Sequence, residues 1–151
     1  MGAIQDIFKK WGNDTVGIIQ GNMARTGTNA SGETSREIKS SNSDTRVTVD
    51  GPAWVFVVET GRGPGGMPPT GKLASWIDAK PVITDNVQNA SFAMSKVIAE
   101  RGTKLFREGG RDDIITPAIS DERVDQLTSD IADAILNETA KIIEDGIASS
   151  Q

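Results

Sequence analysis

The sequence predicts an α+β fold in which a short antiparallel sheet, built on one hairpin, carries long N- and C-terminal helices and two central helices packed on it. Apolar residues recur at helical spacing near both ends of the chain, which predicts the two long helices. β-branched residues alternate with polar ones beside turn-forming residues in the middle, which predicts the hairpin. A length of 151 residues corresponds to one domain, residues 1–151, with a single core.

The N-terminal helix is predicted over about residues 3–25. Gly12, Gly17 and Gly21 interrupt its apolar repeat, and each glycine costs about 1 kcal/mol relative to alanine in a helix. We therefore expect this helix to depend on packing against something else, such as another subunit. The following stretch, residues 26–44, contains almost no large apolar side chain and is predicted to be a flexible loop with room for one short helical turn.

Two strands are predicted in the middle of the chain, at Arg46–Val49 and Trp54–Val58, joined by a turn at residues 50–52. A glycine- and proline-rich loop over residues 61–71 follows, where five Gly and three Pro within eleven residues rule out a regular element. Further along, Ile114-Ile115 stands just before a Thr-Pro pair and is predicted to be a short edge strand.

Three further helices are predicted from their caps and apolar spacing. Thr70 caps a short helix that ends at Lys80-Pro81, and Asp85 caps a second one that ends before Gly102. Ser120 caps the long C-terminal helix. The apolar stripe of that helix consists of Val124, Leu127, Ile131, Ile135, Ile142 and Ile143.

Composition excludes most small-enzyme chemistry. The chain has no Cys and no His, which excludes disulfides, thiolate nucleophiles, imidazole bases and zinc sites built on those residues. The formal charge of -5 opposes a general nucleic-acid role. The excess of negative charge lies in residues 101–151, which carry six basic and eleven acidic side chains. The acidic face of the C-terminal helix is then a solvated surface, a docking face for a basic partner, or a source of repulsion that spaces neighbours.

Two glycine-rich matches fail as phosphate sites. Residues 61–66 fit the spacing G-x-G-x-x-G, but nearby prolines remove amide donors and delay the next helix. Residues 66–72 fit G-x-x-x-x-G-K, but Leu73 stands where a magnesium-binding Ser or Thr is needed. We therefore predict no cofactor, no metal ion and no catalytic residue.

Glu59, at the end of the apolar run, is the one acid whose local sequence suggests partial burial. Its carboxylate is better explained as an acceptor for the amides of residues 60–63, or as a partner of Arg62, than as a catalytic group. It would then hold the glycine- and proline-rich loop in shape. We expect its removal to affect assembly more than folding.

The three tryptophans are candidates for core packing or for interface contacts, because tryptophan is enriched in binding hot spots. The chain has few aromatic residues to fill a core. We therefore expect Trp54 and Trp76 to lie inside and Trp11 to lie at an interface.

An ordered set of segments resembles a known virion family. The run Trp54–Glu59 is followed by Gly61–Pro69, then by a short helix around Leu73–Ile77 that contains a tryptophan, and later by Gly102-Thr103. This order, over about residues 30–106, is similar to that of the tail-completion, or head-to-tail joining, minor tail (neck) proteins of tailed bacteriophages. The resemblance brings no catalytic residue with it.

What the resemblance implies is a structural virion protein, made in the host bacterial cytoplasm, that forms a ring at the head-to-tail interface or in the proximal tail. The implied partners are copies of itself, the portal or adaptor, and tail proteins, while DNA passes through the lumen without specific binding. The predicted interaction residues are Trp11, Glu59, Gly61, Arg62, Gly63, Pro64, Gly65, Gly66, Met67, Pro68 and Pro69. Residues 26–44 are expected to contact neighbours as well.

Two other functions stay open at this point. A nucleic-acid-binding adaptor would show steep salt-dependent affinity through basic residues such as Lys9, Lys10, Arg25 and Arg46. A small carboxylate-based enzyme would need a closed pocket at Glu59 with a second titrating group. No membrane partner is expected, because no segment approaches the roughly 18 apolar residues of a spanning helix.

Overall fold

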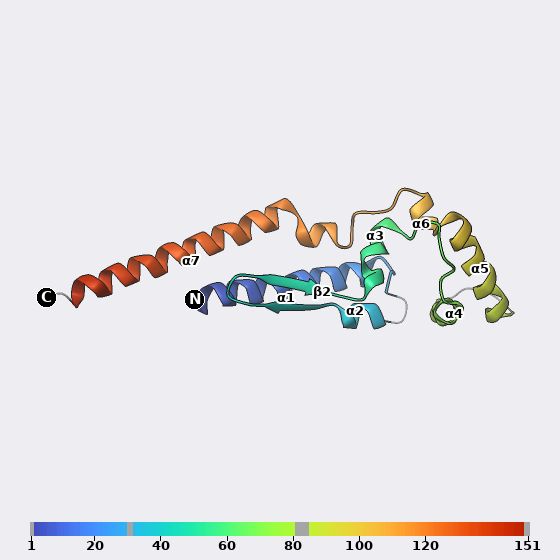
Figure 1. Cartoon of the computed structure of the whole chain (residues 1–151), viewed down its shortest axis with the longest axis horizontal. Helices are drawn as coiled ribbons and strands as arrows, with labels where there is room; N and C mark the ends of the chain where they lie inside the picture. Colours follow the sequence, from blue (N-terminus) through green and yellow to red (C-terminus); the bar gives the residue numbers. More distant parts are fainter. Residues whose placement is uncertain (1, 30–31, 81–84, 150–151) are drawn as a thin grey trace.

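The two terminal helices run along the length of an elongated molecule, and the central helices lie at the end opposite the C-terminus (Figure 1). The computed structural model describes residues 2–29, 32–80 and 85–149. Long helices at both termini and one two-stranded antiparallel sheet confirm the predicted α+β class. In chain order the elements are α1 (Gly2–Arg25), α2 (Glu33–Glu37), β1 (Lys39–Asn42), β2 (Val47–Asp50), the 3₁₀ helix η1 (Ala53–Phe56), α3 (Val57–Thr60), α4 (Thr70–Ala79), α5 (Val87–Arg101), α6 (Lys104–Arg107), the 3₁₀ helix η2 (Thr116–Ile119) and α7 (Asp121–Ala148).

The N-terminal helix forms as predicted, without a break at its glycines, and the hairpin lies along it. β1 and β2 pair antiparallel, with Lys39 opposite Asp50 at one end. Gly12 lies at the contact, because a Cβ placed on it would come within 2.9 Å of both Ser40 Cβ and Val47 Cγ2. The glycine that weakens the isolated helix therefore allows the hairpin to approach α1 closely. The packing on which α1 depends is found inside the chain.

The prediction that Trp54–Val58 pairs with residues 46–49 is wrong. The partner strand is β1, which lies inside the stretch predicted to be a loop, while Trp54–Val58 forms η1 and the start of α3. A short apolar run fits a buried helical turn as well as a strand, because periodicity does not separate the two. β1 has no apolar pattern by which the sequence could predict it, because its residues are polar. Within β1 only Ser40 is partly shielded from solvent. The single helical turn expected in the same stretch is α2.

The core gathers where the C-terminal half of α1 meets η1, α3 and η2. Met23, Ile114 and Ala118 have no exposed surface there. Ile114-Ile115, predicted as an edge strand, forms a bend instead. The strand prediction fails because the amide groups of this segment donate to a side chain rather than to a neighbouring strand.

The two central helices pack mainly against each other, and not on the sheet as predicted (Figure 1). Their contact uses small side chains, because Ala74 of α4 and both Ser91 and Ser95 of α5 are buried. Small side chains allow two helix axes to approach closely. α4 ends at Ala79, and Pro81, the predicted stop, lies outside the described residues.

The caps of these helices differ by one residue from the prediction. Asn86, rather than Asp85, accepts the hydrogen bond of the Asn89 amide at 2.9 Å and caps α5. Thr70 is the first residue of α4, and Pro69 occupies the cap position. A one-residue shift at a helix start follows from the several polar residues that compete for the same role.

The expectation about the tryptophans is wrong for two of them. Trp54 and Trp76, expected inside, are 50% and 41% exposed. The main buried cluster is aliphatic apart from one methionine, and consists of Ile19, Met23, Ile38, Val55, Val58, Ile114 and Ala118. The short segments that carry the tryptophans turn their small and β-branched residues inward instead.

α7 begins after Ser120 as predicted, although the Ser120 side chain makes no cap hydrogen bond. None of the 28 residues of this helix is buried. Figure 1 shows its C-terminal part extending past the N-terminus of α1. Of the predicted apolar stripe, Leu127 and Ile131 are half-buried, whereas Val124, Ile135, Ile142 and Ile143 are exposed.

Candidate functional site

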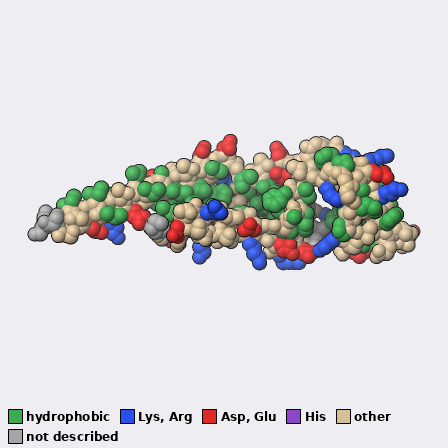
Figure 2. Space-filling model, viewed as in Figure 1, with side chains coloured by type: hydrophobic (Ala, Val, Ile, Leu, Met, Phe, Trp, Pro, Cys, Tyr) green, Lys and Arg blue, Asp and Glu red, His purple; other side chains and the backbone are tan. Residues whose placement is uncertain are grey.

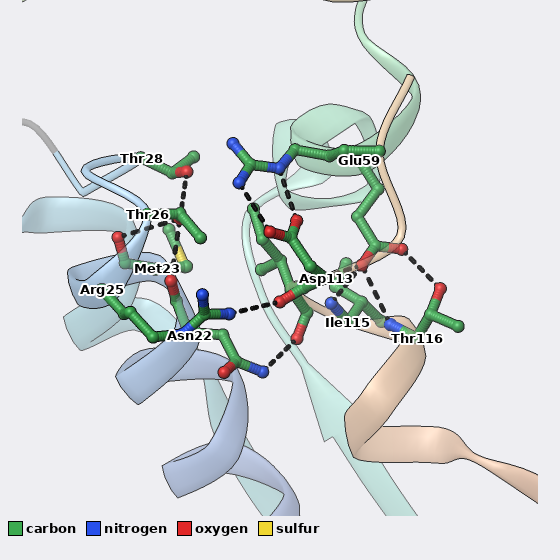
Figure 3. A network of polar contacts seen from close by, with 11 residues as sticks. Asn22, Met23, Arg25, Thr26, Thr28, Glu59, Asp113, Ile115 and Thr116 are labelled. Atoms are coloured by element: carbon green, nitrogen blue, oxygen red, sulfur yellow. Dashed lines mark hydrogen bonds and ion pairs between the residues drawn. The ribbon is translucent and has the colours of Figure 1, made fainter. Parts of the chain in front are cut away.

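Glu59 ties the segment that leads into α7 to the core (Figure 3). Its Oε1 accepts hydrogen bonds from the backbone N–H groups of Ile114, Ile115 and Thr116 at 2.8, 2.5 and 3.0 Å. Its Oε2 accepts a hydrogen bond from the Thr116 hydroxyl at 2.8 Å. The amides converge where η2 begins, and the first N–H groups of a helix lack internal acceptors. Glu59 therefore caps η2 from a distant part of the sequence.

These hydrogen bonds keep the Glu59 carboxyl ionised. The residue is only 9% exposed, and burial raises the pKa of its carboxyl. The hydrogen bonds from Thr116, Ile114 and Ile115 outweigh burial and leave the pKa of Glu59 below its ordinary value of 4.5. Because both oxygens already accept hydrogen bonds from the chain, this carboxylate is poorly placed to transfer a proton to a substrate.

The loop that Glu59 holds is not the predicted one. The sequence favoured the amides of residues 60–63 or the side chain of Arg62, but the contacts go to residues 114–116. Arg62 instead donates to the Gly66 carbonyl at 2.6 Å. The sequence gives no local signal for a partner so far along the chain. Since Glu59 binds the segment at residues 114–116 to the core of its own chain, its loss is expected to affect folding first.

Two side chains of α1 complete this arrangement. Asn22 Nδ2 donates to the Ile114 carbonyl at 3.0 Å, and Arg25 donates to the Asp113 carbonyl at 3.2 Å (Figure 3). Arg111 forms two hydrogen bonds with the Asp113 carboxylate, at 2.6 and 2.9 Å, which lower the pKa of Asp113. We use the name Glu59 junction for the set Asn22, Arg25, Glu59, Arg111, Asp113, Ile114, Ile115 and Thr116.

The predicted interaction loop, Gly61–Pro69, is fastened to α5 and to the residues that follow it. The Gly65 amide donates to the Ala99 carbonyl at 2.9 Å. The Thr103 amide donates to the Arg62 carbonyl at 2.8 Å, and the Arg62 amide donates to Thr103 Oγ1 at 3.0 Å. The amides of Gly61, Arg62 and Gly65 therefore donate to their own chain and are not available to a phosphate.

Gly61 begins this loop where the chain crosses α6 closely. Its φ is 72°, in the left-handed region, and a Cβ placed on it would lie 2.3 Å from the Phe106 amide nitrogen. Only glycine fits such a crossing. Solvent exposure differs along the loop. Gly61 is buried, Arg62, Gly63 and Pro68 are half-buried, and Pro64, Gly65, Gly66, Met67 and Pro69 are exposed. Its exposed tip is thus presented on a fixed base.

Trp11 joins α1 to the first turn of α7. The Arg123 guanidinium lies over its ring, 5.6 Å from the centroid, and the Trp11 Nε1 donates to the Arg123 carbonyl at 3.3 Å. Arg123 also donates to Thr15 Oγ1 at 3.1 Å and to the Ala118 carbonyl at 2.9 Å. Trp11 is half-buried by these contacts. It is engaged within the chain, and its contact with another subunit stays a prediction.

A group of exposed apolar side chains lies farther along α7. We call it the α7 stripe, and it consists of Ile135, Leu136, Ile142 and Ile143, each 49–66% exposed. A groove separates α7 from Ala3 and Ile7 of α1, and on the α7 side it is lined mainly by polar residues such as Asp130, Asp133, Asn137 and Lys141. At 100° per residue these polar positions lie on a different face from the stripe. The α7 stripe therefore faces away from α1.

A second exposed surface, missed in the sequence, lies on the central helices. Phe92 and Phe106 are 58% and 45% exposed. Figure 2 shows Lys and Arg side chains gathered at this end of the molecule. The available signal was charge: residues 61–111 carry eight Lys or Arg against four Asp or Glu. The exposed aromatic and basic residues of this region include Phe92, Lys96, Arg101, Lys104, Phe106 and Arg107. They lie on more than one face, because Arg101 is about 180° around α5 from Phe92, and Lys104 pairs with Glu108 at 3.7 Å.

Two hollows and the search for metal-ligand clusters bear on the remaining site predictions. One open groove lies between α1 and α7 and another between α1 and β1, and Glu59 lines neither. Within residues 2–29, 32–80 and 85–149, no three His, Cys, Asp or Glu side chains come together as metal ligands. Of the helices described, none combines the length and apolar character needed to cross a bilayer. Among known proteins, no family model, curated protein or solved structure matches the chain.

Proposed function

We propose that the chain is a structural virion protein of a tailed bacteriophage that assembles with copies of itself into a ring in the head-to-tail connector, neck or proximal tail. The observation that carries this proposal is α7, which has 28 residues, none of them buried, and an exposed apolar stripe. Most of the stability of an amphipathic helix comes from packing of its apolar face. A subunit that completes this packing against its neighbours accounts for the feature.

Two further features support an assembly role. The ordered segments from Trp54 to Thr103 resemble those of tail-completion proteins, and the α+β class agrees with that resemblance. The loop Gly61–Pro69 presents an exposed tip on a base fixed to α5. Such a loop is suited to contact a rigid partner, because little conformational entropy is lost on binding. In this proposal its partners are neighbouring subunits, the portal or adaptor, and tail proteins.

The proposal assigns no enzymatic activity and no specific binding of DNA. Both Glu59 carboxylate oxygens already accept hydrogen bonds from residues at the start of η2. Of the basic residues considered for nucleic acid, Lys10 pairs with Asp14 at 2.9 Å and Arg25 donates to the Asp113 carbonyl. The net charge of -5 also opposes binding to phosphates. DNA would pass through the ring without specific contacts.

Native mass spectrometry of the purified chain over a concentration series tests this function. A single closed oligomer of fixed copy number is expected, with a central opening visible by negative-stain electron microscopy. A monomer at every concentration, or a dimer as the largest species, would contradict the ring. Tight DNA binding that weakens steeply with salt would instead favour the adaptor function.

A further inference from the structure

The α7 stripe lies on a face of α7 that the described residues of its own chain leave uncovered. Ile135, Leu136, Ile142 and Ile143 are 49–66% exposed, and the groove toward α1 is lined by the polar side of the helix. The C-terminal part of α7 extends past the N-terminus of α1 (Figure 1). Figure 2 shows hydrophobic side chains along the upper edge of this part and charged side chains along its lower edge. The apolar face is therefore turned away from the subunit that carries it.

The stripe follows a seven-residue repeat. Ile135 and Ile142 form one row, and Leu136 and Ile143 form a second row. A line of small residues with the same spacing runs between the two rows, and it consists of Ala132, Thr139 and Gly146. Apolar residues at this period are typical of helices that pack along one another, and small residues at the centre let the two axes approach to about 8 Å. The repeat therefore predicts that the occupant of this face is itself a helix.

The centre of this face is suited to burial. Thr139 Oγ1 donates to the Ile135 carbonyl at 2.8 Å, so burying its hydroxyl leaves no donor without an acceptor. The charged side chains of residues 126–148 are Asp130, Asp133, Glu138, Lys141, Glu144 and Asp145. At 100° per residue, each of them lies about 100° or more around the helix from the line of small residues. A helix packed on this line therefore brings no charge of α7 into the centre of the contact.

The other helices of ten or more residues that the structure describes offer no matching surface. Their exposed sides carry charges, which are Lys9, Lys10 and Asp14 on α1, Lys72 and Asp78 on α4, and Lys96 and Glu100 on α5. Packing these side chains on an apolar stripe would remove their hydration. A second copy of α7 offers an uncharged apolar face with the same repeat and the same length, about 21 Å from position 132 to position 146.

We infer that two copies pair through this face, with the α7 stripe of one copy packed on the α7 stripe of the other. With about 100 Å² of each stripe side chain exposed and the small residues between them, the pair would cover on the order of 1,000 Å², which reaches the lower bound for a specific interface. A surface that packs on itself joins two copies by a two-fold axis and is fully occupied in the pair. This inference rests on the proposed assembly role, and it makes pairs of copies the units of the ring, so that the copy number is even.

Substitutions at exposed positions test the pairing by sedimentation velocity and native mass spectrometry. Leu136→Glu with Ile143→Glu places two carboxylates in the contact, and it is expected to weaken association at least about 30-fold, the effect of losing a hot-spot contact. Asn137→Glu with Ala148→Glu is the matched control, because it adds the same charge on the polar side of α7. The control is expected to associate like the natural chain. Circular dichroism checks that both variants keep their helices.

Disulfide trapping provides a second measurement, which detects the contact directly. The chain contains no cysteine, so a single introduced one reports only on its own position. Thr139→Cys, at the middle of the line of small residues, is expected to give a disulfide-linked dimer on mild oxidation, because closely packed helices bring the two Cα atoms within the roughly 4.4–6.8 Å that a disulfide spans. Asn137→Cys, on the polar side of the helix, is the control and is expected to give none on a non-reducing gel.

Three results would overturn the pairing. The first is a natural chain that stays monomeric at every concentration. The second is a Leu136→Glu, Ile143→Glu variant that associates as strongly as its control, and the third is Asn137→Cys cross-linking as readily as Thr139→Cys. The ring fails separately. A dimer as the largest species would keep the pairing and exclude the ring, whereas a closed ring that survives the Leu136→Glu, Ile143→Glu substitutions, or that has an odd copy number, would do the reverse.

Discussion

The helices at the two ends of the chain have similar lengths and different surroundings. α1 has 24 residues and α7 has 28, and both carry an apolar face. On α1 that face is covered, with Phe8, Gly12, Thr15, Ile19 and Met23 buried. On α7 no residue is buried. An amphipathic pattern therefore indicates that one face of a helix packs against something. It does not indicate whether the same chain or another chain supplies that packing.

Replacing one isoleucine by alanine in each helix is expected to give the largest difference in the free energy of unfolding. Ile19 on α1 is 5% exposed, and Ile143 on α7 is 56% exposed. Ile19→Ala is expected to lower the free energy of unfolding by about 3 to 4 kcal/mol, because it leaves a cavity in the core. Ile143→Ala is expected to change it by less than about 0.5 kcal/mol in the monomer, since no packing is lost.

Urea unfolding at low protein concentration, where the chain is monomeric, measures both variants. Comparable losses in the two variants would mean that α7 is packed within its own subunit. In that case the comparison between the helices would fail, and with it the exposed stripe.

Glu59→Ala is expected to have the next largest effect. It removes the acceptor of the Ile114, Ile115 and Thr116 amides, and unsatisfied buried donors cost about 1 to 3 kcal/mol each. Since solvent can reach part of this segment, we expect a loss of about 3 kcal/mol in total. Urea unfolding measures it, with Glu108→Ala on the surface as the control. An unchanged stability would show that the Glu59 junction does not hold α7 to the core.

Gly12→Ala tests the close packing of the hairpin against α1. A Cβ at this position meets Ser40 and Val47 at 2.9 Å, so the hairpin must move outward, at a cost of about 1 to 3 kcal/mol. Gly21→Ala is the matched control, because its Cβ would meet nothing within 4 Å. It is expected to stabilise the monomer by up to about 1 kcal/mol through helix propensity. Thermal unfolding of both variants should show shifts of opposite sign, and shifts of equal sign would contradict the close contact with the hairpin.

Sequence patterns predicted the long elements and missed the contacts between distant segments. Periodicity located α1, α4, α5 and α7 within one or two residues. It failed for β1, because Lys39–Asn42 are all polar and show no apolar alternation. It failed for Trp54–Val58, since a five-residue apolar run fits either a strand or a helical turn.

The candidate site shows the same limit. Glu59 was singled out as a partly buried carboxylate that accepts from the amides of residues 60–63 or pairs with Arg62; it is 9% exposed and accepts from amides of residues 114–116 instead. Its partners lie in a segment far along the chain, and no local spacing encodes such a pairing. The exposed stripe was visible as a pattern on α7, but exposure is a property of the fold.

The smallest expected effect is the pH dependence that Glu59 contributes. Its pKa is lower in the folded chain than the ordinary value of 4.5, so the unfolded chain binds the proton more tightly. The stability from this group is therefore fully present above pH 4.5 and is lost as the pH falls through the lower, folded pKa. Glu59→Gln keeps an acceptor and removes the titration. The natural chain is expected to be more stable than this variant at pH 7, and the difference should shrink below pH 4.5. A constant difference in urea unfolding between pH 7 and pH 3 would mean that the hydrogen bonds of the Glu59 junction do not select the ionised carboxylate.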